Sequence, residues 1–256
     1  MTLLARLKAW LELARVSNLP TVWSNVVMGL AWGTSRHLPE LGIDPAAVAL
    51  PGLGDLVNQG FMLLLAGTLI YTAGMLLNDV FDQFIDARER PHRPIPRGAV
   101  CPHRATAAAV VMLIAGLGAA AVFTSPWVLP LIGGLVTCVV LYNALHTRFR
   151  GAVLLMAACR ALLVFAAVMA VWTPETTQLG PRLIPPAVLF AYTLLIAAVA
   201  RREVQFARIP LVIALIVAMP LIGAGLCLLA GHPAAATCCV GCAALTLVGQ
   251  RFIKGS

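Results

Sequence analysis

The chain has 256 residues, of which 61% are hydrophobic and 11% are charged. A soluble domain is about half apolar and about one quarter charged, so this composition excludes an ordinary soluble enzyme and indicates a membrane protein. The net charge of +8 would suit a nucleic-acid binder. The basic residues lie between apolar runs, however, as in membrane proteins, so we expect no nucleic-acid partner.

The first 17 residues predict an amphipathic helix. Leu3, Leu7 and Trp10 share one face, and Arg6 and Lys8 lie on the other. Such a helix lies in the membrane interface with its apolar face in lipid. We treat the whole chain, residues 1–256, as a single transmembrane domain.

Eight apolar runs follow, each close to the ~20 residues that cross a bilayer as a helix. They cover residues 19–35, 58–78, 104–123, 127–146, 152–172, 183–200, 209–230 and 233–250. The predicted fold class is therefore an all-α integral membrane protein, a bundle of about eight transmembrane helices surrounded by membrane lipid.

The basic residues are unevenly distributed between the two predicted ends of the bundle. Fifteen of the 18 lie on the side that holds both termini, Arg36 and Arg182 lie on the other, and Arg160 lies inside a span. Because basic loops stay in the cytoplasm, we expect cytoplasmic termini in a bacterial inner membrane.

The most informative stretch runs from Asn78 to Gly98 and reads NDVFDQFIDARERPHRPIPRG. On a helix, Asn78, Asp79, Asp82 and Asp86 would lie within an arc of ~100°. Carboxylates that gather on one face repel each other unless a cation lies between them, and Mg²⁺ takes such oxygen ligands. The other interpretation is a helix end whose charges face water.

This stretch resembles the first aspartate-rich motif of the UbiA superfamily of membrane prenyltransferases, NDxxDxxxD followed by an Arg-Pro-Ile-Pro-Ser-Gly-like turn. Here the turn begins at Arg93, and Arg97 stands at the usual Ser position. The resemblance implies a UbiA-like prenyltransferase fold and catalytic, Mg²⁺-binding roles for Asp79, Asp82 and Asp86. It also implies transfer of an isoprenyl group from an isoprenyl diphosphate to a hydrophobic or aromatic acceptor.

Further residues are candidates for substrate binding. Asn78 could contact phosphate, and Arg93 keeps its position in the motif. Tyr142 and His146 stand where many UbiA-like proteins carry Tyr and Lys, although a His there also suits a helix C-terminus. Arg160 lies deep in the fifth span, where a charge is costly and usually functional unless it snorkels to the surface.

The usual second acidic motif is missing between the sixth and seventh spans, which makes the chain similar to an EboC-like branch of the superfamily. That loop reads Arg201-Arg202-Glu203, with Glu203 as its only carboxylate. We expect these three residues to assist substrate binding, because arginines can hold phosphate without metal. The alternative function is a non-catalytic protein that binds a secondary-metabolite precursor or helps to export it.

Overall fold

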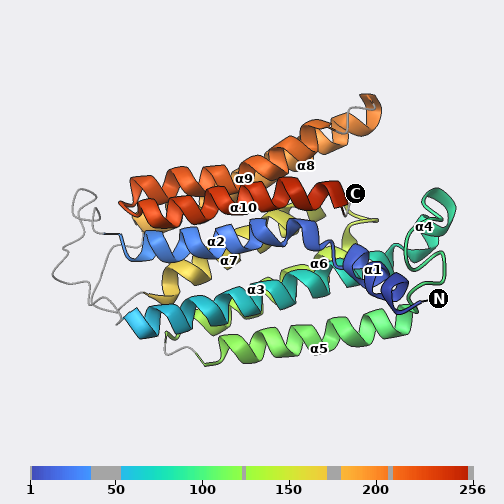
Figure 1. Ribbon diagram of the computed structural model, residues 1–256, viewed down its shortest axis with the longest axis horizontal. Helices are drawn as coiled ribbons and strands as arrows, with labels where there is room; N and C mark the ends of the chain where they lie inside the picture. Colours follow the sequence, from blue (N-terminus) through green and yellow to red (C-terminus); the bar gives the residue numbers. More distant parts are fainter. Residues whose placement is uncertain (1, 36–52, 123–124, 172–179, 207–209, 253–256) are drawn as a thin grey trace.

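The computed structural model describes residues 2–35, 53–122, 125–171, 180–206 and 210–252, and the elements among them are helices (Figure 1). The long ones are α2 (Leu19–Gly33), α3 (Leu53–Phe81), α5 (Pro102–Ala120), α6 (Val128–Leu145), α7 (Ala152–Ala170), α8 (Ile184–Phe206), α9 (Pro210–Leu229) and α10 (Pro233–Phe252). The short ones are α1 (Leu3–Leu13), α4 (Gln83–Glu89) and two 3₁₀ turns at Val16–Asn18 and Gly180–Leu183.

The membrane bundle predicted from the apolar runs is confirmed. In the described part of the chain, seven helices are long and apolar enough to cross a membrane, namely α3 and α5 to α10. The eighth predicted span is α2, whose 15 residues lie inside the bundle. The two largest differences from the predicted boundaries are the start of α3, at Leu53 instead of 58, and the end of α8, at Phe206 instead of 200, so Arg201 to Glu203 are helical.

Helix ends follow local residue chemistry. Pro102 and Pro233 open α5 and α10, where a missing N–H removes no helical hydrogen bond and the fixed φ suits the first turn. After α9, Gly231 has φ 79°, and the His232 N–H reaches the Cys227 carbonyl at 2.9 Å. This pattern closes a helix through a left-handed residue, a conformation that glycine adopts without steric penalty.

Helices α2 and α7 lie in the middle of the bundle, with α9 and α10 on one side and α3 and α5 on the other (Figure 1). Both central helices contribute to two buried clusters. Val26 and Ala166 belong to the cluster on the α3 side, whereas Met28 and Val168 belong to the one on the α9 side. The α2–α7 pair therefore joins the two halves of the core.

The two central helices approach closely at Gly29 and Gly33. A Cβ atom built on Gly29 would lie 2.5 Å from the Ala167 Cβ and 2.8 Å from the Val164 carbonyl oxygen. Small residues at this spacing allow the van der Waals packing that drives helix association in lipid. The contact therefore sets the separation of α2 and α7.

Helix α1 packs on the bundle through the second half of its length. Ala9 and Leu13 are buried, whereas Leu3, Leu4 and Leu7 are exposed. The predicted lipid-facing side is thus exposed at the start of the helix, whereas Trp10 on the same side packs against the core. Placement of α1 in the membrane interface stays a prediction.

We predict that Gly29→Ala destabilises the fold by about 1–3 kcal/mol, because the added methyl group overlaps α7. The matched control is Gly133→Ala in α6, where a Cβ would meet nothing within 4 Å, and where alanine favours the helix by up to about 1 kcal/mol. Thermal unfolding of both variants in detergent measures the difference. Equal melting temperatures for the two variants would contradict the proposed close packing.

Candidate functional site

The acidic motif lies at the end of α3, where the chain bends. Helix α3 ends at Phe81 and α4 begins at Gln83, with Asp82 between them at φ −85° and ψ 0°. Backbone hydrogen bonds still continue through the bend, from the Asp82 N–H to the Asn78 carbonyl at 2.9 Å and from the Asp86 N–H to the Asp82 carbonyl at 2.8 Å. The motif is therefore nearly helical, and α4 ends at Glu89, before Pro91, since a proline disfavours helical backbone in the residue that precedes it.

Arg93 joins two of the three aspartates. Its Nη1 atom lies 2.9 Å from Oδ2 of Asp86 and 3.3 Å from Oδ1 of Asp79. All three side chains are buried, with 7%, 2% and 5% of the surface of Arg93, Asp86 and Asp79 exposed. The Arg-Pro-Ile-Pro turn thus folds back onto the motif and places one guanidinium between two buried carboxylates.

Arg15 reaches the same cluster from the junction of α1 and the following 3₁₀ turn. Its Nη2 atom lies 3.2 Å from Oδ1 of Asp79 and 3.3 Å from Oδ1 of Asn78. Arg15 has φ 45° and ψ 49°, a left-handed conformation that is unfavourable for a residue with a side chain. The surrounding contacts hold this strained backbone, as is frequent at functional sites.

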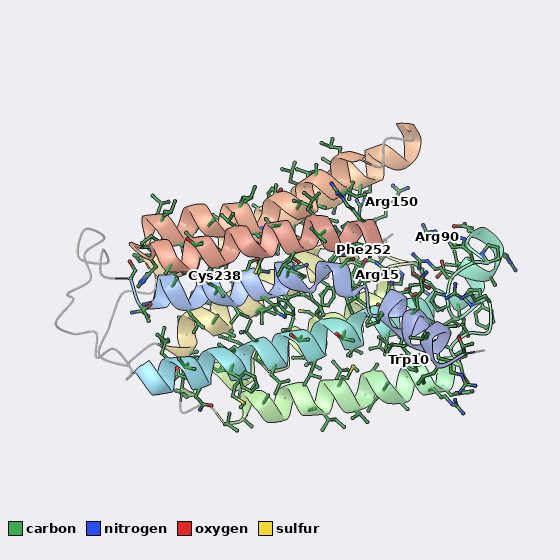
Figure 2. All side chains as sticks on the ribbon, viewed as in Figure 1. Trp10, Arg15, Arg90, Arg150, Cys238 and Phe252 are labelled. Carbon is green, nitrogen blue, oxygen red and sulfur yellow. The ribbon has the colours of Figure 1, made fainter. Side chains whose placement is uncertain are left out.

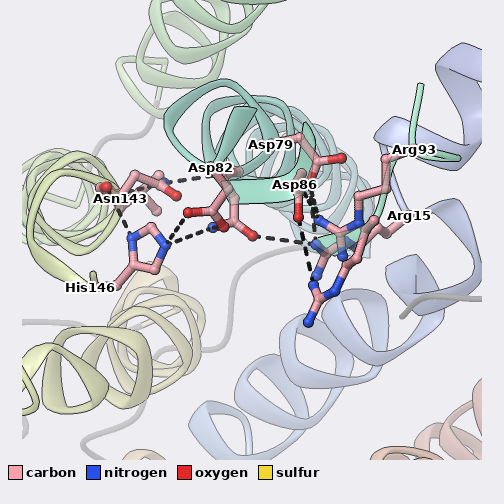
Figure 3. A network of polar contacts seen from close by, with 11 residues as sticks. Arg15, Asp79, Asp82, Asp86, Arg93, Asn143 and His146 are labelled. Carbon is pink, nitrogen blue, oxygen red and sulfur yellow. Dashed lines mark hydrogen bonds and ion pairs between the residues drawn. The ribbon is translucent and has the colours of Figure 1, made fainter. Parts of the chain in front are cut away.

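Asp82 points the other way, toward α6 (Figure 3). Its Oδ1 atom lies 2.8 Å from Nε2 of His146, and the Nδ1 atom of the same ring lies 3.0 Å from the Asn143 carbonyl oxygen. Both partners offer hydrogen-bond acceptors. These two contacts fix the orientation of the His146 ring beside Asp82.

Asn143 fixes α6 against α3 next to this pair. Its amide nitrogen donates to the Gly74 carbonyl at 3.3 Å and to the Val139 carbonyl at 2.9 Å. Tyr142 stacks on the His146 ring, with 5.3 Å between the ring centroids. The end of α6 therefore holds both the His146 ring and the bundle helix that carries the aspartates.

Below the cluster, a cavity of about 260 Å³ extends into the bundle. Arg15 and Asn78 line its mouth, and most of the remaining wall is apolar, with contributions from α2, α3, α6, α7, α8 and α9. On α3 the lining runs from Asn78 to Gly67, a distance of ~16 Å along the helix. The cavity is thus a narrow apolar space with a charged entrance.

Arg160 and Tyr71 face each other partway along this cavity. The guanidinium carbon lies 5.9 Å from the centre of the Tyr71 ring, within the range of a cation–π contact. In the described part of the chain, the three aspartates pair with Arg15, Arg90, Arg93 and His146, and not with Arg160.

The remaining residues predicted to bind substrate, Arg201, Arg202 and Glu203, belong to α8. Arg201 is exposed and donates to the Arg150 carbonyl at 2.8 Å. It lines a second hollow of about 590 Å³ together with Tyr142 and His146. Figure 2 shows Arg15, Arg90 and Arg150 at the same end of the bundle. The side chains of Arg202 and Glu203 lie outside the described residues.

The donor chemistry of the motif fits Mg²⁺, since Asp79, Asp82, Asp86 and the amide of Asn78 all offer oxygen ligands. Their arrangement differs from a single shared cation site. Asp79 and Asp86 converge on Arg93, and Asp82 pairs with His146. Within the described residues, no three acidic, His or Cys side chains are grouped closely enough to hold a metal. Arg93 supplies the positive charge between two of the carboxylates.

The structure thus brings together Asn78, the three aspartates, Arg93 and His146, and it places Tyr142 beside them. Sequence reasoning missed two contributors. Arg15 counted only as one of the basic residues on its side of the bundle, and its contact with Asp79 joins residues 64 apart. Asn143 was adjacent to Tyr142, but nothing in the sequence indicated which carbonyl groups it contacts.

We predict that Arg93→Gln lowers the free energy of unfolding by about 3–5 kcal/mol, because two buried carboxylates lose their shared cation. Arg97→Gln is the control. Arg97 pairs with Glu12 at 2.7 Å on the surface, with 40% and 27% of the two side chains exposed, so the loss should stay below about 1 kcal/mol. Chemical denaturation in detergent measures both values. Similar losses for the two variants would show that the buried network is not stabilising.

The comparisons with known proteins agree with this geometry. The profile of the UbiA prenyltransferase family matches residues 41–255. A digeranylgeranylglyceryl phosphate synthase of Methanoregula boonei is 44% identical over 86 residues, 33% of this chain and 30% of that protein. Chlorophyll synthase of Arabidopsis thaliana is 29% identical over 103 residues, 40% of this chain and 23% of that protein. The chain spans about a third or less of the length of these curated relatives.

Solved structures share the fold across nearly the whole chain. A structure of digeranylgeranylglyceryl phosphate synthase aligns with a TM-score of 0.58 and 15% identity over 95% of both chains. A UbiA homologue from Archaeoglobus fulgidus bound to DMAPP and Mg²⁺ aligns with a TM-score of 0.55 and 17% identity, covering 95% of this chain and 86% of that one. Because the family profile covers most of its length, the chain belongs to the UbiA prenyltransferase family.

Proposed function

We propose that this protein transfers an isoprenyl group from a polyprenyl diphosphate to an acceptor, with Mg²⁺ as cofactor. One observation carries the proposal: a cluster of aspartates and basic side chains lies at the mouth of an apolar cavity inside a membrane bundle. A prenyl diphosphate has the matching two-part chemistry. The structural relatives support a prenyl donor, because the UbiA homologue from Archaeoglobus fulgidus was solved with DMAPP and with GPP.

The diphosphate would bind at the mouth. Arg15 and Asn78 line it, and His146 lies against Asp82 beside it. Guanidinium groups donate strong hydrogen bonds to phosphate oxygens, and an imidazole N–H group also donates. The prenyl chain would lie against the apolar side chains of the wall, and a longer chain would continue toward lipid between the helices.

The reaction breaks the bond between C1 of the prenyl group and the diphosphate oxygen, and the bonding electron pair leaves with the diphosphate. A nucleophilic atom of the acceptor forms the new bond to C1 and releases its proton. Arg15 at the mouth, with Arg93 behind it, would stabilise the negative charge that develops on the leaving oxygen. Asp79, Asp82, Asp86 and Asn78 are the residues that would hold Mg²⁺, in exchange for their present partners, and the ion would neutralise further charge on the diphosphate.

Three narrower predictions belong to this proposal: the branch of the family, the membrane that holds the protein and the kind of acceptor. The single acidic cluster supports the resemblance to an EboC-like branch, although the matched relatives carry the names of digeranylgeranylglyceryl phosphate synthases and a chlorophyll synthase. Those synthases come from archaea and a plant, so a bacterial inner membrane stays a prediction. A hydrophobic or aromatic acceptor also stays a prediction.

A second candidate function is binding or export of a prenylated or aromatic metabolite without catalysis. The observation that favours it is the pairing of Asp79, Asp82 and Asp86 with the chain's own cations. A carrier of this kind would bind its ligand without metal. The dependence of binding on Mg²⁺ therefore separates the two functions.

We predict that Asp82→Asn abolishes Mg²⁺-dependent binding and turnover of geranyl diphosphate, since a carboxylate ligand and the partner of His146 are lost together. The control is Glu89→Gln, an exposed acid at the end of α4. Binding is measured on purified protein with Mg²⁺ and with a chelator. Binding that ignores both the metal and Asp82 would favour the carrier.

We also predict that both termini face the cytoplasm. Figure 1 places the two ends of the chain at the same end of the bundle as α4, and fifteen of the 18 basic residues belong to that side in the sequence-based topology. The positive-inside rule then assigns this end to the cytoplasm. Alkaline phosphatase and green fluorescent protein fused to the C-terminus test the orientation. An active phosphatase with a dark fluorescent protein would overturn it.

A further inference from the structure

Arg160 is a charged residue well inside the bundle. It lies on α7, lines the apolar cavity and faces the Tyr71 ring from α3. Tyr71 precedes Asn78 by seven residues on α3, so this level lies ~10 Å below the mouth. The diphosphate cluster and Arg160 therefore mark two different depths of one cavity.

The protein supplies Arg160 with neutral partners. Its Nη1 atom donates to the amide oxygen of Asn25 at 3.2 Å when the Asn25 nitrogen faces the Thr21 carbonyl, 3.0 Å away. That orientation is the one in which both ends of the amide are satisfied. The Tyr71 ring is the other contact. Neither partner carries a negative charge.

No acidic side chain lines this cavity in the part of the chain that the structure describes. The aspartates at the mouth already pair with Arg15, Arg93 and His146. A charge inside the membrane is expensive and normally pairs with an opposite charge. A hydrocarbon chain packed against Arg160 would exclude water without supplying that partner.

We propose that Arg160 binds the single anionic group, a carboxylate or a phosphate, of an organic ligand that enters the cavity. This identification of the ligand rests on the proposed transfer reaction: the ligand is the acceptor of that reaction, and its anionic group points away from the prenyl C1 atom. The deeper site is separate from the diphosphate site, because a diphosphate carries more charge than one arginine neutralises and has its own cationic cluster above.

This placement limits the distance between the anionic group and the nucleophilic atom of the acceptor. The anionic group lies near the level of Tyr71, and the nucleophilic atom has to reach C1 just inside the mouth. The two levels are separated by less than the ~10 Å between Tyr71 and Asn78. A compact acceptor, in which a few bonds separate the nucleophile from the anion, fits this interval.

The test compares octanoate, octyl phosphate and 1-octanol, three probes of equal chain length, on the purified full-length protein in a non-ionic detergent. Titration calorimetry is carried out on the wild type, Arg160→Gln and Arg160→Lys. We expect both anions to bind the wild type, and Arg160→Gln to weaken them ~30-fold or more with little effect on octanol. Arg160→Lys should retain part of the anion affinity, because it keeps the charge.

The control variant is Arg104→Gln, an exposed arginine in the first turn of α5. It should bind all three probes as the wild type does. Comparison between variants cancels any partition of a probe into the micelle. If Arg160→Gln leaves octanoate affinity unchanged, or weakens octanol as strongly as octanoate, the anion site does not exist.

The melting temperature separates a ligand-binding role of Arg160 from a purely structural one, because the two roles predict changes of opposite sign in Arg160→Gln. Arg160→Gln removes a charge inside the bundle that lacks an anionic partner, so its melting temperature without ligand should equal or exceed that of the wild type. Octanoate should raise the melting temperature of the wild type and not that of Arg160→Gln. A lower melting temperature in the variant, with octanoate still stabilising it, would show that Arg160 serves only the fold.

Geranyl diphosphate binding in the same preparations separates this proposal from the transfer reaction. Arg160→Gln should bind geranyl diphosphate as the wild type does, since the diphosphate site lies at the mouth. If the wild type binds octanoate through Arg160 but does not bind geranyl diphosphate, the transfer reaction is wrong and the anion site stands. If geranyl diphosphate binding is lost in Arg160→Gln, the two sites are one and the deeper site is wrong.

Discussion

The ion pair between Arg93 and two buried aspartates is the contact on which the rest of the site depends. Asp79 and Asp86 belong to different helices, α3 and α4, and Arg93 comes from the turn that follows them. Two carboxylates with 5% and 2% exposure are unfavourable neighbours without a cation. One guanidinium therefore fixes the bend at Asp82, the position of α4 and the fold of the turn together.

The cavity below depends on a different constraint, the close contact of α2 and α7. These helices contribute Val22, Arg160 and Leu163 to its wall, and their separation is set at Gly29 and Gly33, deeper in the bundle. The close contact lies toward one end of the pair, and the cavity lies toward the other. The fold thus places a polar cluster on one helix end and an apolar cavity directly beneath it.

The sequence was sufficient for the fold class because composition and apolar run length report directly on the solvent around a helix. All eight runs became bundle helices, with shifted ends at α3 and α8. The acidic motif and the turn at Arg93 could also be predicted, since they are local in sequence. Contacts between distant residues could not be predicted. The pairing of Arg15 with Asp79 and of His146 with Asp82 depends on how the helices pack, which helical periodicity does not encode.

The nearly helical path through Asp82 also determines which mutations the motif tolerates. Phe81, Phe84 and Ile85, which lie between the aspartates, are exposed, so the identity of these spacer side chains is weakly constrained. Their number is not. One inserted residue would turn Asp86 by about 100° around the helix axis and carry it away from Arg93. Insertions and deletions between Asp79 and Asp86 are therefore excluded, whereas many substitutions at the spacer positions remain compatible with the same site.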